Sequence, residues 1–88
     1  MLMADRAQLA DLRTAVATVF ADALKIDVPS HDTDLLATGL LDSLGFVDLL
    51  LELERRFGLR VAMETIEPDN FRSVANIAQF IAGQRKVA

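Results

Sequence analysis

Residues 39–58 read GLLDSLGFVDLLLELERRFG, a leucine-rich segment bounded by a glycine at each end. Its apolar residues recur at helical spacing, and Gly58 is a typical helix terminator. We therefore predict a helix from Ser43 to Phe57. One arc of this helix is apolar enough to form a core face, and it comprises Phe46, Leu49, Leu50, Leu53 and Phe57. We expect Leu49, Leu50, Leu53 and Phe57 to be buried together with Phe20, Ile77 and Ile81.

A second apolar strip lies outside that arc and consists of Leu44, Val47 and Leu51. Glu54 bounds it on one edge, and Asp48 and Arg55 bound it on the other. Two interpretations are open. The helix could be buried on two sides, as is common in small bundles. Alternatively, the strip could be an exposed surface with an acidic margin, which is typical of a docking site for another protein.

The helix opens on Asp42-Ser43. Asp or Ser before an apolar helical run is an ordinary N-terminal cap, so periodicity alone predicts only a structural role for this pair.

Three further helical segments are predicted outside the central one. The first runs from about Asp5 to Lys25, with Lys25 placed near its C-terminal end, where the helix dipole favours a cation. A short turn of helix is predicted at residues 64–67, just before Pro68. The last helix is predicted over residues 73–82, capped by Ser73 and ended by Gly83. No sustained alternation of apolar residues predicts a strand, so the expected fold is an all-α four-helix bundle formed by a single domain, residues 1–88.

A long connection precedes the central helix, from Ile26 to Asp42. It is rich in turn-forming residues, and a loop of this length is unusual in a compact domain unless its side chains pack. We expect its leucines to fold back onto the core; they are Leu35, Leu36, Leu40 and Leu41. His31 lies in the polar part of this loop and is predicted to be solvated, with no functional role.

Composition excludes several function classes. The 88 residues contain no cysteine and one histidine, so thiolate chemistry and metal binding are not expected. The net charge of −4 disfavours nucleic acid and suits partners that present Lys and Arg. No apolar segment is long enough to span a membrane. Because Asp5 and Arg6 follow Met1 so closely, a secretory signal is not expected, and we predict a cytoplasmic monomer.

The residues quoted above resemble a known family. The run Gly39-Leu40-Leu41-Asp42-Ser43-Leu44 is similar to the modification motif of acyl and peptidyl carrier proteins. Residues 49–58 resemble the rest of the second helix of these carriers. Phe71-Arg72-Ser73-Val74, followed by Ile77 and Ile81, resembles the entry to their last helix. The resemblance covers roughly residues 35–82 and implies the acyl-carrier type of bundle, with a long first loop and a short third helix.

The resemblance also implies a function. A phosphopantetheinyl transferase would move 4′-phosphopantetheine from coenzyme A onto the Ser43 hydroxyl, and Asp42 would help the transferase to engage. The thiol of the arm would then carry an acyl or aminoacyl group as a thioester. An exposed serine at a helix N-terminus suits a phosphodiester, because backbone N–H groups and the positive end of the dipole lie beside it. The chain departs from many carriers at Gly45, where they have an acidic or polar residue.

The resulting hypothesis is a non-catalytic carrier, with no catalytic and no metal-binding residues, serving polyketide, nonribosomal peptide or related biosynthesis. Its partners would be the transferase, an acyl- or aminoacyl-loading enzyme, and accepting enzymes such as an acyltransferase or synthase modules. These enzymes would dock at the strip of Leu44, Val47 and Leu51 and at its acidic margin of Asp48 and Glu54.

Two alternatives remain beside the carrier. An unmodified helical adaptor could bind a partner through Leu44, Val47 and Leu51 without any cofactor. A small enzyme could use Ser43 as a nucleophile, but its only histidine, His31, lies in the loop and no other base is evident.

Overall fold

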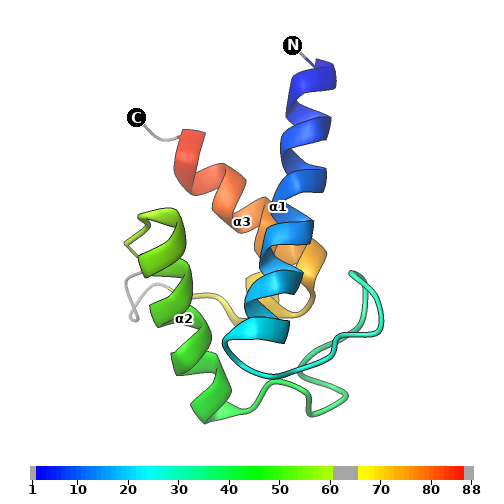
Figure 1. Cartoon of the computed structure of the whole chain (residues 1–88), viewed down its shortest axis with the longest axis vertical. Coiled ribbons are helices and arrows are strands. Elements are labelled where there is room, and N and C mark those ends of the chain that lie inside the picture. Colours follow the sequence, from blue (N-terminus) through cyan, green and yellow to red (C-terminus); the bar gives the residue numbers. More distant parts are fainter. Residues whose placement is uncertain (1, 61–65, 87–88) are drawn as a thin grey trace.

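A computed structural model describes residues 2–60 and 66–86, with side-chain environments for 9–60 and 66–84. These ranges form three α-helices and one 3-10 helix, and they contain no strand: α1 (Leu2–Asp22), α2 (Ser43–Phe57), η2 (Pro68–Phe71) and α3 (Val74–Lys86) (Figure 1). The all-helical class is confirmed, but the described chain has a 3-10 helix in place of a fourth α-helix. Among the described helices, none combines the length and the apolar character needed to cross a bilayer.

The first helix ends three residues earlier than predicted. It stops at Asp22, and Lys25 adopts a left-handed backbone conformation with φ 58°. The N–H of Ile26 then donates to the carbonyl of Phe20 at 2.8 Å, which turns the chain back toward the core. The prediction that the helix extends to Lys25 was therefore wrong, because this residue forms the reversal that follows the helix.

The short third helix also differs from the prediction. Residues 64 and 65 of the predicted 64–67 helix lie outside the described residues, and Ile66 and Glu67 are not helical. Pro68 begins η2 instead of ending a helix. Its fixed φ and missing N–H suit the first helical position, where that N–H would have no acceptor.

The last helix begins as predicted and continues further. The N–H of Asn76 donates to Ser73 Oγ at 3.1 Å, so the predicted cap is confirmed. Gly83 does not end α3, which continues to Lys86. This glycine does not adopt positive φ, and glycine within a helix costs only about 1 kcal/mol relative to alanine.

The core draws on all helices and on the long loop. Leu49, Leu50 and Leu53 of α2 are buried as predicted, whereas Phe57 is only half-buried against the cluster. The other buried apolar residues are Leu12, Val16, Val19, Phe20, Leu35, Leu41, Phe71, Val74, Ile77, Ala78 and Ile81. The predicted packing of the loop leucines is confirmed, because Leu35 and Leu41 are buried and Leu36 and Leu40 pack against the cluster.

The loop between α1 and α2 is fixed across the start of α3. The N–H of Ala75 donates to the carbonyl of His31 at 2.9 Å, and the N–H of Leu35 donates to the carbonyl of Arg72 at 2.6 Å. The Arg72 guanidinium bridges Asp34 at 3.5 Å and Asp69 at 3.1 Å. As Figure 1 shows, α1 runs away from the two termini and α2 runs back toward them. The start of α2 therefore lies at the end of the molecule opposite both termini.

Candidate functional site

Asp42, and not Ser43, caps the start of α2. Asp42 Oδ1 accepts the N–H of Gly45 at 2.7 Å, and the Asp42 carbonyl accepts the N–H of Phe46 at 2.8 Å. Asp42 itself has an extended backbone, as expected of a cap residue. Ser43 occupies the first helical position. The cap predicted for the Asp42-Ser43 pair is therefore provided by Asp42, and the Ser43 hydroxyl takes no part in it.

The chain has three serines, and their hydroxyl groups have different environments. Ser73 Oγ is largely buried and accepts the N–H of Asn76. Ser30 Oγ lies 3.2 Å from the Thr33 hydroxyl and accepts the N–H of Asp32. Ser43 is exposed, and its hydroxyl has no hydrogen-bond partner among the described residues. Ser43 is thus the serine whose oxygen is available for chemistry without loss of a native contact.

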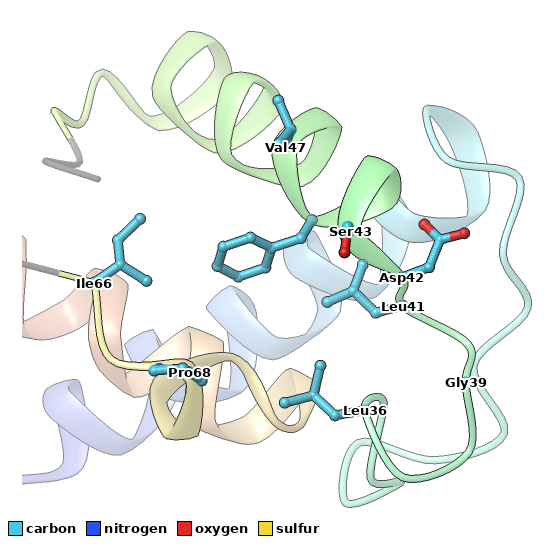
Figure 2. A pocket seen from close by; sticks show the side chains of 9 residues that line it. Leu36, Gly39, Leu41, Asp42, Ser43, Val47, Ile66 and Pro68 are labelled. Atoms are coloured by element: carbon cyan, nitrogen blue, oxygen red, sulfur yellow. The ribbon is translucent and has the colours of Figure 1, made fainter. Parts of the chain in front are cut away.

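An open groove of about 640 Å³ lies beside Ser43. Its walls come from the end of the long loop, from the first turns of α2 and from the segment that leads into η2 (Figure 2). The lining residues are Leu36, Gly39, Leu41, Asp42, Ser43, Phe46, Val47, Ile66 and Pro68. Most of these are apolar. Figure 2 shows Ser43 at the edge of the groove, with Ile66 and Pro68 across from it.

Packing around position 45 explains why this residue is a glycine, which the sequence alone did not reveal. A Cβ at this position would lie 3.2 Å from Asp42 Oδ1 and 3.3 Å from Leu41 Cδ1. A side chain would therefore press on the capping carboxylate and on a buried leucine. The glycine lets the cap close tightly over the first turn, directly beside Ser43.

The second apolar strip of α2 is exposed. Leu44 is 79% exposed, Leu51 58% and Val47 43%. The interpretation that α2 is buried on two sides is therefore wrong. Val47 also lines the groove, so the strip and the groove form a continuous apolar surface that starts at Ser43.

Charges border this strip unevenly. Glu52 pairs with Arg56 at 3.0 Å and with Arg55 at 3.8 Å, so two guanidinium groups share one carboxylate there. Asp48 is exposed and forms no ion pair with any described residue. Glu54 is half-buried. Asp48 thus presents a carboxylate beside the strip, which suits a partner bearing Lys or Arg.

The described part of the groove offers few groups for catalysis. Among the described residues that line it, Asp42 is the only ionisable one, and its carboxylate is engaged in the cap. His31 is exposed and lines a separate cleft beside α1, with Thr14 and Thr18. In the described part of the chain, no cluster of His, Cys, Asp or Glu could hold a metal ion. What the site offers is an accessible hydroxyl beside an apolar groove and an exposed apolar strip.

Comparison with known proteins agrees with this geometry. The family described as "Phosphopantetheine attachment site" matches residues 14–81. The D-alanyl carrier protein of Streptococcus sanguinis (strain SK36) is 32% identical over 76 residues, covering 85% of this chain and 96% of the relative. D-alanyl carrier protein 2 of Lactiplantibacillus plantarum is 33% identical over 73 residues, covering 82% and 91% respectively. The chain therefore belongs to the acyl and peptidyl carrier proteins, a non-catalytic family whose members hold 4′-phosphopantetheine covalently.

Proposed function

We propose that Ser43 carries the 4′-phosphopantetheine arm and that the protein presents an acyl or aminoacyl thioester on it to partner enzymes. The observation that carries this proposal is the free, exposed hydroxyl of Ser43 within the matched region. Ser30 and Ser73 already use their hydroxyl groups in local structure. Modification at Ser43 removes no hydrogen bond from the fold.

The surroundings of Ser43 fit a phosphodiester. The amides of Ser43 and Leu44 lie in the first turn of α2, where N–H groups have no intrahelical acceptor. These donors and the positive end of the helix dipole favour an anion on the neighbouring oxygen. When bound, the arm supplies the thiol that forms the thioester, which a chain without cysteine cannot provide.

The attachment is a substitution at phosphorus. Ser43 Oγ forms a bond to the phosphorus that bears pantetheine, the pyrophosphate P–O bond of coenzyme A breaks, and the adenosine bisphosphate portion leaves. The hydroxyl proton is released. Because Asp42, the ionisable residue among the described lining residues, is engaged in the cap, we propose that the transferase accepts this proton. We propose that Asp42 contributes to transferase recognition, and its position at the mouth of the site places a carboxylate next to the reacting serine.

For the cargo, the relatives favour a small aminoacyl group. Both relatives named above are D-alanyl carrier proteins, so we propose D-alanine or a similar small acyl group. The role in polyketide, nonribosomal peptide or related biosynthesis that the sequence suggested is not specifically supported by these relatives. We further propose that it acts as a monomer in the cytoplasm, where coenzyme A and an aminoacyl-loading enzyme would supply the arm and the cargo.

We propose that loading and accepting enzymes, such as an acyltransferase or synthase modules, dock on the exposed strip. Leu44, Val47 and Leu51 would provide the apolar contact, which supplies most of the binding free energy. Asp48 and Glu54 would face Lys or Arg of the partner and mainly set the encounter rate and orientation. The strip begins one residue after Ser43, so a docked enzyme would lie next to the base of the arm.

The proposal is tested by intact mass after incubation with coenzyme A and a broad-specificity phosphopantetheinyl transferase. The wild type should gain the mass of one phosphopantetheine, and Ser43→Ala should gain nothing. Ser30→Ala is the matched control, because it removes another exposed hydroxyl and should be modified like the wild type. Equal modification of Ser43→Ala, or no modification of the wild type by several transferases, would refute the assignment.

A further inference from the structure

We propose that Phe46 closes the floor of the groove beside Ser43, so that an acyl chain on the arm cannot enter the helical core. The carrier would therefore hold short or polar cargo and leave its thioester in solvent. The inference rests on the proposed attachment at Ser43 and deepens it by assigning the class of cargo.

Aromatic rings separate the groove from the core. Phe46 lines the groove and is half-buried. Its ring meets that of Phe71 edge-on, with centroids 5.3 Å apart and the planes at 90°. Phe71 also packs on Phe80, with centroids 5.0 Å apart. The three rings link α2, η2 and α3, and edge-to-face pairs of this kind resist displacement.

The described core residues behind this wall are closed to solvent. Phe71, Leu49, Leu53 and Ile77 have no solvent exposure. The groove is lined by the loop, by α2 and by residues 66–68, and no described residue of α1 or α3 reaches it. Protein interiors are close-packed, and added methylenes force side chains out of their preferred conformations. A long chain could therefore enter the core only if Phe46 moved.

Chain length then determines how the cargo behaves. A short or charged group, such as an acetyl or an aminoacyl group, exposes little apolar surface and gains little by entering the protein. A long chain has a strong tendency to leave water, yet Phe46 leaves it only the groove, which is open to solvent, so that the thioester stays exposed to reagents. Cargo of the first kind suits this carrier, because its thioester stays accessible to the next enzyme without any opening of the core.

The experiment loads acetyl and octanoyl arms from the matching acyl-coenzyme A onto the wild type, Phe46→Ala and Phe80→Ala. Intact mass confirms loading, and the rate of thioester cleavage by hydroxylamine is then measured relative to the same free acyl-coenzyme A. Phe80→Ala is the control, because it also removes a ring that contacts Phe71 but does not line the groove. Phe46→Leu serves as a second, milder variant should Phe46→Ala lose its thermal unfolding transition.

In the wild type and in Phe80→Ala, octanoyl and acetyl arms should be cleaved at similar relative rates. In Phe46→Ala, two methylenes entering the vacated space would protect the octanoyl thioester about tenfold. Phe46→Leu should give smaller protection of the same sign. The octanoyl arm should also raise the unfolding temperature of Phe46→Ala alone, since a bound chain stabilises the folded state.

Three outcomes would overturn the inference. Protection of the octanoyl arm in the wild type would show that the groove or the core already shelters a long chain, despite Phe46. Equal protection in Phe80→Ala would show that general loosening, and not Phe46, admits the chain. Absence of protection in folded Phe46→Ala and Phe46→Leu would show that this ring is not the closure. A failure of the proposed attachment is recognised separately, because no variant would then gain mass from either acyl-coenzyme A.

Discussion

Leu51 and Leu53 lie two residues apart on α2, and the structure predicts opposite consequences when each is changed. Leu53 has no solvent exposure, whereas Leu51 is 58% exposed. Truncation of a buried leucine to alanine typically costs 2–5 kcal/mol, because transfer energy is lost and a cavity remains. Full burial of a leucine stabilises by about 1.5–3 kcal/mol, and less than half of the Leu51 side chain is buried. Leu51→Ala should therefore cost about 1 kcal/mol or less.

Substitution by aspartate should separate the two positions more clearly than substitution by alanine. A carboxylate at position 53 would lie unpaired in the core, which costs several kcal/mol in a domain whose total stability is of order 5 kcal/mol. Leu53→Asp should not fold. Leu51→Asp should fold with only a modest loss of stability, because its carboxylate faces water. It should nevertheless lose productive docking, since it places a charge on the apolar surface of the exposed strip.

The assay has two parts. Urea unfolding followed by circular dichroism gives the stability of Leu51→Ala and Leu53→Ala, and transfer of cargo from the holo form gives the docking competence of Leu51→Asp. If Leu51→Asp unfolds as Leu53→Asp does, the strip belongs to the core and the docking surface lies elsewhere. A loss of less than about 0.5 kcal/mol in Leu53→Ala would show that the core itself has been misassigned.

Three further predictions concern the start of α2 and its charges. In thermal unfolding, Asp42→Ala should cost about 0.5–2 kcal/mol through loss of the cap, whereas Ser43→Ala should stay within about 0.5 kcal/mol of the wild type. A larger loss in Ser43→Ala than in Asp42→Ala would show that Ser43 is the cap. Asp48→Lys should slow loading or transfer at low salt, with an unchanged unfolding temperature, and the deficit should shrink as salt is added; a deficit that is independent of salt would contradict an electrostatic role. Gly45→Ala should gain less than the roughly 1 kcal/mol that alanine offers in an open helix, because its Cβ meets Asp42 and Leu41; a full gain in urea unfolding would show that the cap adjusts without cost.

Local signals in the sequence were enough to place α2. Its limits at Ser43 and Phe57 follow from the leucine spacing and from Gly58, which adopts φ 67° after the last turn. The end of α1 was not predictable in this way. Lys25 takes a left-handed conformation without being a glycine, because the return of Ile26 toward the core imposes it. The position of Pro68 was not predictable either. A proline is compatible both with the residue after a helix and with the first residue of a helix, and only the fold determines which of the two applies.

The site was predicted in part. The sequence identified Asp42-Ser43 and the strip of Leu44, Val47 and Leu51, but it could not say which of the adjacent residues is the cap. That distinction depends on the backbone at Asp42, whose extended conformation directs its carboxylate to the N–H of Gly45. The groove was missed altogether, since it joins the loop, α2 and residues 66–68, and no spacing within one segment predicts such contacts.

The most direct test of the central claim is the position of the arm in the modified protein. The wild type is incubated with coenzyme A and a transferase, digested, and analysed by tandem mass spectrometry of the peptides that contain Ser30, Ser43 and Ser73. We predict phosphopantetheine on the peptide with Ser43 alone, with fragment ions that assign it to that hydroxyl. An arm on Ser30 or Ser73, or a fully unmodified Ser43 peptide after complete reaction, would contradict the account.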